Sequence, residues 1–153
     1  MLRFRLSLVL LLALAACTDV TGLDRLVITV VVTPDRIVPG DTAVIAVRLT
    51  NPTPTPIEIP TRCSRRYQIA NAQGEVVVGN EGLICALDFP PPTVLGPFES
   101  IDGQATWTGY RQRRNGGTWV TEPVGAGVYR VYGTVEGRRS RPDTIEVEAP
   151  ATP

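Results

Sequence analysis

The chain has 153 residues, a length that suits one domain with its own hydrophobic core. Its 15 basic and 15 acidic residues cancel, so it lacks the basic excess with which proteins release counterions from nucleic-acid phosphates. The chain contains no histidine, which excludes Ser-His-Asp and Cys-His nucleophilic sites and histidine-containing zinc sites. We therefore expect neither a nucleic-acid partner nor an enzyme.

The N-terminus has the pattern of an export signal. Arg3 and Arg5 precede an apolar run over 6–16, which is too short to cross a bilayer because a spanning helix needs about 20 apolar residues. The run ends in Leu14-Ala15-Ala16-Cys17, which resembles the lipobox of bacterial lipoproteins. An ordinary secretory signal that ends by accident at a cysteine and a buried N-terminal helix are the alternatives.

The lipobox resemblance implies that residues 1–16 are a signal peptide, removed before a Cys17 that receives diacylglycerol. Its acyl chains would anchor the protein to a membrane. The residue after Cys17 is Thr18 and not an acid, which by analogy with lipoprotein sorting favours the outer membrane, facing the periplasm, in a bacterium with two membranes. Loss of Arg3 and Arg5 leaves a slightly acidic mature chain in the cell envelope.

Two further cysteines, Cys63 and Cys85, remain in the mature chain. An even number of cysteines in an oxidising compartment predicts a disulfide between them. The alternative is a pair of buried free thiols. Two thiolates alone do not make a structural zinc site, which takes four ligands, so we expect no metal and no cofactor.

After a polar tether over 17–24, β-branched and alternating stretches separated by proline and glycine predict strands. We expect strands at 26–33, 42–50, 98–110, 127–136 and 144–148, and a hairpin formed by 67–71 and 75–78. The proline-rich stretch 51–60 predicts an edge strand or a crossing between sheets, and 80–92 an irregular connection. Asp102-Gly103 predicts a bulge or bend, and 111–117 an exposed loop.

About seven short strands over 25–149, with no helical period and a tail at 150–153, predict an all-β fold. An immunoglobulin-like antiparallel β-sandwich fits this pattern best, and a closed barrel is the competing architecture. The side chains expected in the core come from strand positions that alternate toward one face. They are Ile45, Val47, Leu49, Trp107, Tyr129 and Val131.

A longer pattern resembles a known family. It comprises Asn51, Tyr67-x-Ile69-x-Asn71-x-x-Gly74, Leu95-x-Pro97-x-Glu99-Ser100, Trp107 and Gly127-x-Tyr129. This order is similar to the intracellular proteinase inhibitor family, the BsuPI-type domain, over about residues 40–136. The resemblance implies an immunoglobulin-like sandwich that inhibits serine proteinases. The founding inhibitor is intracellular, whereas this chain has a lipobox, and the resemblance assigns no reactive residue.

Two segments are candidates for contacting a protein partner. The loop 111–117 presents Arg111, Arg113 and Arg114, which suit a trypsin-like pocket, and Trp119 follows it. Its glycines predict flexibility, so a solvated hairpin tip or a cleavable loop is the alternative. The segment 85–97, restrained by the predicted disulfide and by prolines, is the stiffer candidate, and its alternative is a plain crossover.

These observations predict a membrane-anchored, non-enzymatic module that binds a protein, with a serine proteinase as the partner class implied by the resemblance. The alternative is a structural or assembly lipoprotein whose sheet edge near Ile57-Glu58-Ile59 pairs with a partner strand. An envelope hydrolase is a third possibility, for which the sequence offers no nucleophile–base pair. No motif of the sequence identifies the binding target or the oligomeric state.

Overall fold

The computed structural model describes residues 22–60, 66–79 and 91–150. Apart from one short 3-10 helix, the regular structure of these residues is all strand. The elements are η1 Leu23–Arg25, β1 Val27–Thr33, β2 Arg36–Ile37, β3 Ala43–Thr50, β4 Ile57–Ile59, β5 Tyr67–Ala70, β6 Val76–Val78, β7 Thr93–Leu95, β8 Ser100–Trp107, β9 Tyr110–Asn115, β10 Thr118–Pro123, β11 Gly127–Val135, β12 Arg138–Arg139 and β13 Asp143–Val147. No helix of the described part is long and apolar enough to cross a membrane.

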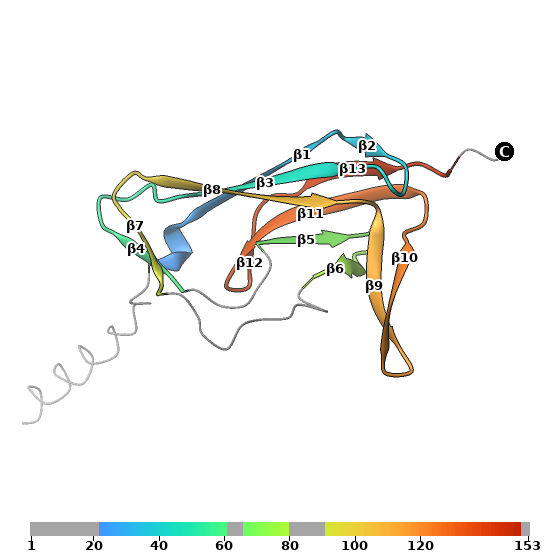
Figure 1. The fold of residues 1–153 in the computed structure, drawn as a ribbon. Coiled ribbons are helices and arrows are strands. Elements are labelled where there is room, and N and C mark those ends of the chain that lie inside the picture. Colours follow the sequence, from blue (N-terminus) through green and yellow to red (C-terminus); the bar gives the residue numbers. More distant parts are fainter. Residues whose placement is uncertain (1–21, 61–65, 80–90, 151–153) are drawn as a thin grey trace, which may run out of the picture.

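Two sheets pack face to face (Figure 1). One has the order β1-β3-β8 and is antiparallel throughout, and the other has the order β2-β13-β11-β5-β6, with β12 beside β11. Within these sheets only β2 and β13 run parallel. The first strand of the chain, β1, thus belongs to the first sheet, and the next strand, β2, belongs to the second. The structure is the predicted immunoglobulin-like sandwich, and not a barrel.

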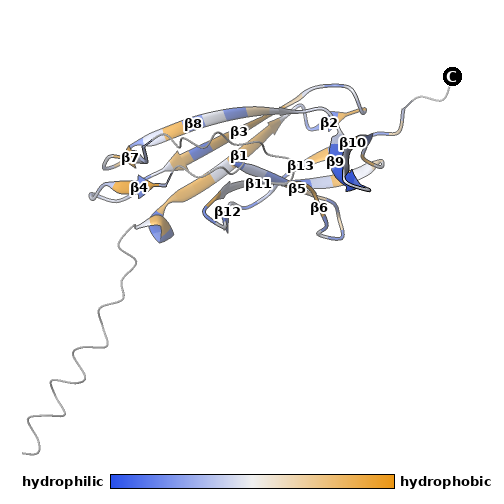
Figure 2. Cartoon of the chain, turned by 60° about the horizontal axis from the view of Figure 1, so that its bottom comes forward, coloured by the Kyte–Doolittle hydropathy of each residue, from blue (hydrophilic) through white to orange (hydrophobic). Residues whose placement is uncertain are grey.

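The core lies between the sheets and contains all six predicted core residues, none more than 6% exposed. The alternation expected along β11 is present, because Tyr129, Val131, Gly133 and Val135 face inward. A Cβ atom on Gly133 would lie 2.8 Å from Ile28 Cγ2, so only glycine lets the sheets approach this closely. Figure 2 shows β1 and β3 mostly in the colour of hydrophobic residues.

An aromatic pair occupies one end of the core. The rings of Trp107 and Tyr129 meet edge to face, with centroids 5.7 Å apart. The Tyr129 hydroxyl donates a hydrogen bond to the Gly125 carbonyl oxygen (2.7 Å), and the Trp107 indole N–H donates to the Tyr110 carbonyl oxygen (2.8 Å). A tyrosine that bonds the backbone four residues upstream is the tyrosine corner of immunoglobulin-like sandwiches.

Asn51 is fully buried and uses its side chain to organise the connection after β3. Its amide nitrogen donates to the carbonyl oxygens of Thr55 (2.8 Å), Leu95 (3.1 Å) and Gly96 (2.9 Å). Its amide oxygen accepts from the backbone N–H of Thr53 (2.9 Å) and from that residue's hydroxyl (2.7 Å). The buried amide is therefore satisfied, and it ties the proline-rich turn to the end of β7.

The predicted long strand over 98–110 is in fact parts of two strands, and the β3–β8 ladder runs in unbroken register through the predicted bulge or bend. β8 ends at Trp107, and Gly109 turns the chain with φ 76° against the Cα atom of Pro39. Asp102 pairs regularly with Arg48 across the β3–β8 ladder. Asp102 faces solvent and contacts the Arg48 guanidinium at 2.7 Å, and this hydrogen bond lowers the pKa of the carboxyl. A polar residue next to glycine here indicates an outward face rather than a bulge.

Other expectations are refined by the structure. The end of the predicted tether is structured, because η1 packs Leu23 against the core. The stretch 51–60 contains β4, which pairs with β7 and buries Ile57 and Ile59. The predicted signal peptide over 1–16, Cys17, Cys63 and Cys85 lie outside the described residues. Lipidation and the disulfide therefore stay predictions, as does any stiffening of 85–97 by that bridge.

We predict that Trp107→Ala lowers the free energy of unfolding by about 3–5 kcal/mol, because the buried indole would leave a cavity beside Tyr129. Trp119→Ala is the matched control, since Trp119 is 48% exposed and its loss should change stability by about 0.5 kcal/mol or less. Urea unfolding followed by circular dichroism measures both. Equal losses in the two variants would contradict the assignment of Trp107 to the core.

Candidate functional site

The segment predicted as a flexible basic loop is a β-hairpin. β9 and β10 pair in register from Tyr110↔Pro123 to Asn115↔Thr118, so only Gly116 and Gly117 form the turn. Both glycines have positive φ, 54° and 92°, as a two-residue type I′ turn requires. The prediction of a loop over 111–117 is therefore wrong, and the alternative of a solvated hairpin tip is the one that the structure shows, because these glycines complete a regular ladder.

The hairpin projects from one end of the sandwich, past the sheet that contains β5 and β6 (Figure 1). All of its residues from 112 to 121 are exposed. Trp119 and Val120 are large hydrophobic residues on this surface, 48% and 39% exposed. β9 itself is coloured as hydrophilic in Figure 2. The hairpin is thus a two-stranded ribbon with solvent on most of both faces.

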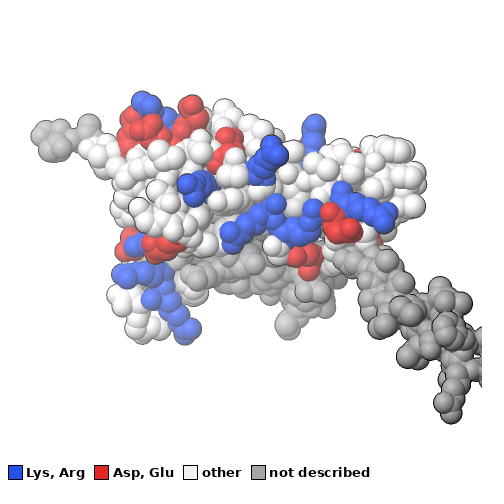
Figure 3. Space-filling view, turned by 180° about the vertical axis from the view of Figure 1, so that it is seen from behind, with Lys and Arg blue, Asp and Glu red and all other residues white. Residues whose placement is uncertain are grey.

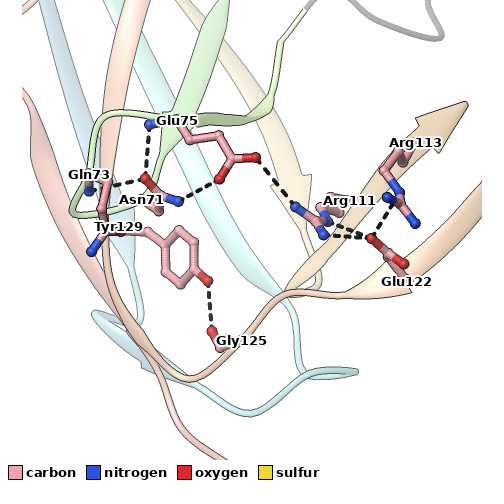
Figure 4. Close-up of polar contacts among 8 residues, drawn as sticks. All are labelled: Asn71, Gln73, Glu75, Arg111, Arg113, Glu122, Gly125 and Tyr129. Carbon is pink, nitrogen blue, oxygen red and sulfur yellow. Dashed lines mark hydrogen bonds and ion pairs between the residues drawn. The ribbon is translucent and has the colours of Figure 1, made fainter.

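Charged side chains hold the base of the hairpin (Figure 4). Glu122 Oε1 lies 2.7 Å from Arg111 Nη2, accepts a 2.7 Å hydrogen bond from Arg111 Nε, and lies 3.5 Å from Arg113 Nε. Arg111 also lies 3.7 Å from Glu75, whose other carboxylate oxygen accepts a hydrogen bond from Asn71. The Arg111 and Glu122 side chains are each about one-third exposed or less. This ion-pair network connects the hairpin to the β5–β6 turn.

Tyr129 lies close to the same network (Figure 4). Burial raises the pKa of its hydroxyl, while the nearby Arg111 charge lowers it and the Glu75 charge raises it. The hydroxyl is therefore a stable hydrogen-bond donor to Gly125 at neutral pH. This geometry gives Tyr129 a structural role at the hairpin base.

An open groove of about 230 Å³ lies between the hairpin base and β6. Its lining is mixed, with apolar side chains from β5, β6 and β8 and polar side chains from the hairpin, and it includes Tyr67, Val77, Trp107, Tyr110, Gln112 and Thr121. Among the described residues, the lining includes no carboxylate and no thiol. This part of the groove can contact another molecule, and its side chains form no carboxylate-based acid–base pair.

The structure separates the predicted contact residues into two groups. Arg111 lies in the ion-pair network and supports the hairpin, with Arg113 near the same carboxylate. Arg114 and Trp119 are directly opposite each other across the ladder and both are exposed, as expected for Trp119. The sequence reasoning missed Glu122 and Val120. The signal was present, since a Gly-Gly pair followed by Thr118-Trp119-Val120-Thr121 is a hairpin pattern.

No family model and no curated protein sequence matches the chain. Among solved structures, it is similar to part of Pseudomonas fluorescens alkylpurine DNA glycosylase AlkC, bound to DNA containing an abasic site analog. That match has a TM-score of 0.51 and 17% identity, and covers 82% of this chain but 31% of the glycosylase. This likeness concerns the β-sandwich fold alone.

Two further structures match less closely. One is a β-glucosidase from Listeria innocua in complex with isofagomine, with a TM-score of 0.46, 16% identity, and coverage of 81% of this chain and 16% of that one. The other is the CARDB domain of the PF1109 protein from Pyrococcus furiosus, in complex with di-metal ions. Its TM-score is 0.43, its identity 18%, and the match covers 81% of this chain and 86% of that domain.

We predict that Glu122→Gln loosens the hairpin without unfolding the sandwich. The carboxylate lies between two guanidinium groups, so its loss should cost about 1 kcal/mol locally and raise amide hydrogen exchange in β9 and β10 about fivefold. Glu58→Gln is the control, because Glu58 is exposed on β4, far from the hairpin in the topology. Unchanged exchange in the Glu122 variant would mean that the ladder alone holds the hairpin.

We also predict a pH dependence from Tyr129. Its folded pKa is raised above its value in the unfolded chain, so its stabilisation is complete below about pH 10 and is lost as pH rises through the folded pKa. An ultraviolet absorbance titration should show a late-ionising tyrosine that disappears in Tyr129→Phe. A titration identical in the two proteins would place Tyr129 in a more solvated site.

Proposed function

We propose that this protein is a non-enzymatic, protein-binding module, anchored by lipid at Cys17 in a bacterial cell envelope, with the β9–β10 hairpin as its binding surface. The observation that carries the proposal is the hairpin itself. It exposes Trp119 and Arg114 as a cross-strand pair on a ribbon that lies mostly outside the sandwich. Isolated two-stranded hairpins are marginally stable in water. A hairpin that projects from the domain and is held at its base by ion pairs is therefore a candidate for a binding role.

The composition of the hairpin supports binding to a protein. Tryptophan and arginine are the side chains that contribute most often to binding hot spots, and Val120 adds apolar area beside them. The type I′ turn and the ion pairs at the base order the ribbon in advance. Because less conformational freedom is lost on association, a pre-ordered ribbon binds more tightly than a flexible loop.

The hairpin also has unpaired strand edges. In the described part of the chain, β9 and β10 pair only with each other. Each therefore has one edge with free backbone donors and acceptors, which an extended partner segment can join as a further strand. Backbone pairing would provide affinity, and Trp119 and Arg114 would provide selectivity.

A trypsin-like serine proteinase is the partner class implied by the resemblance to proteinase inhibitors, and Arg113 and Arg114 are side chains that an acidic specificity pocket accepts. Assembly through the edge of β4 is the alternative. β4 has three residues, and of these only Glu58 is exposed. The hairpin offers the larger accessible surface, and we therefore favour it.

We predict that the mature, membrane-derived protein begins at a diacylglycerol-modified Cys17 and captures a protein partner from envelope extracts. Arg114→Ala/Trp119→Ala should weaken that binding at least 100-fold, since hot-spot truncations cost about 2 kcal/mol or more each. Arg48→Ala/Phe98→Ala is the matched control, because it also removes one exposed arginine and one exposed aromatic ring, but away from the hairpin. Mass spectrometry of the N-terminus tests the modification of Cys17. Titration of the captured partner measures the change in affinity of each variant.

An inhibition assay against a panel of serine proteinases separates the partner classes. Nanomolar inhibition that is lost in Arg113→Ala/Arg114→Ala would support a proteinase as the partner. Cleavage between Arg113 and Arg114 without inhibition would make the hairpin a substrate and would contradict inhibition through this surface. An intact Met1 terminus or an unmodified Cys17 would contradict the lipid anchor.

A further inference from the structure

The outward side of the β11 sheet presents arginines. Arg130 and Tyr132 alternate with the buried residues of β11, and Arg139 lies opposite Thr134 in the short β11–β12 ladder. Arg66, just before β5, accepts a hydrogen bond from the Thr134 N–H at 2.7 Å through its carbonyl oxygen. We call Arg66, Arg130 and Arg139 the arginine face. From behind, arginine side chains follow one another across the middle of the molecule, with acidic side chains beside them at one end of the row (Figure 3).

These three arginines differ from others on the surface. Arg36 and Arg48 contact carboxylates at 2.7–3.0 Å. Within the described ranges, no ion pair joins any residue of the arginine face to a carboxylate. Arg139 instead lies over the Tyr132 ring, with its Cζ atom 5.4 Å from the centroid. The arginine face thus presents three guanidinium groups that have no carboxylate partner among the described residues.

The charge is local and not a property of the whole chain. Residues 1–16 include two arginines and no acidic residue, so the chain that follows has 13 basic and 15 acidic residues. In a domain with a net negative charge, one positive face makes the charge distribution asymmetric. Such a domain presents one particular side to an anionic surface.

The arginine face lies near the point where the chain enters the domain. Arg138, beside Arg139 on β12, donates a hydrogen bond to the Leu23 carbonyl oxygen and so holds the β11–β12 turn against η1. Gly22 is five residues after Cys17, a separation that spans at most about 18 Å. A lipid at Cys17 would keep this end of the domain within about two Debye lengths of the membrane at physiological salt.

We propose that the arginine face docks the domain on anionic lipid headgroups of the membrane to which it is tethered. The proposal rests on the lipid anchor of the proposed function and extends it with a second attachment. Basic residues near an anionic membrane surface attract it individually, and a lipid chain combined with a basic patch binds far more firmly than either alone. Arginine also forms paired hydrogen bonds with phosphate oxygens, the chemistry that headgroups offer.

Docking in this orientation has a consequence for the hairpin. β9 and β10 project past the same sheet at its other end (Figure 1). With the arginine face on the membrane, the hairpin would therefore point toward that membrane. Arg113 and Arg114 then lie near the headgroups as well. Membrane docking and partner binding would therefore compete, and variants at the hairpin are needed to separate the two surfaces.

The test uses the unlipidated chain over 18–153, which contains the whole described sandwich and its core. Co-sedimentation with phosphatidylglycerol–phosphatidylcholine vesicles should exceed that with pure phosphatidylcholine and should fall as salt rises. Arg130→Gln/Arg139→Gln should lower binding to the anionic vesicles roughly 30-fold, since each arginine near an anionic surface contributes about fivefold. Arg36→Gln/Arg48→Gln changes the net charge equally but removes arginines that already have carboxylate partners, and should lower binding less than threefold.

Several results would overturn the proposal. These are equal binding to both kinds of vesicle, equal losses in the two double variants, or a larger loss in Arg113→Gln/Arg114→Gln than in the arginine-face variant. Binding to heparin without binding to anionic vesicles would assign the face to a soluble polyanion instead. Because the tested chain lacks Cys17, these outcomes are independent of lipidation, which mass spectrometry of the full-length protein decides separately.

Discussion

The edge-to-face contact between Trp107 and Tyr129 is the interaction on which the rest of the structure depends. It closes one end of the core, and each ring also holds one end of the hairpin. Trp107 bonds the carbonyl of Tyr110, where β9 begins, and Tyr129 bonds the carbonyl of Gly125, just after β10. A backbone hydrogen bond of 2.9 Å from Val124 N–H to the Gly109 carbonyl closes the same base. The surface used in the proposed function is therefore positioned by the core.

The strands with one buried face could be predicted from the sequence, and the exposed hairpin could not. Ile45, Val47, Leu49, Tyr129 and Val131 alternate with outward residues, so their strands, their inward face and the sandwich were predictable. β9 has no such alternation, because Arg111 and Arg113 contact Glu122, Arg114 is exposed, and none of the three is part of the core. The register of β9 with β10 depends on a two-residue turn and on carboxylates distant in sequence. The hydrophobic periodicity of the sequence predicts neither of these.

The alternation of side chains along the strands builds the core, and it also determines which residues lie on the arginine face and on the hairpin surface. Residues of β11 that face outward place Arg130 and Tyr132 on the sheet next to Arg139, and the cross-strand register places Arg114 opposite Trp119. A sequence read without strand pairing contains these arginines only as scattered charges. The pairing shows which arginines have carboxylate partners, such as Arg48 with Asp102, and which leave their charge available for another molecule.

The central claim is that the hairpin contacts a protein partner while the lipid at Cys17, rather than the arginine face, keeps the domain at the membrane. Site-specific photocrosslinking in cells tests it most directly, with a photoreactive amino acid at Val120 in the full-length chain and, as control, at Val31 on the opposite sheet, which is also exposed. The account predicts a discrete, larger membrane-associated product from position 120 and none from position 31. Products of equal yield at both positions, or a product from position 31 alone, would contradict it.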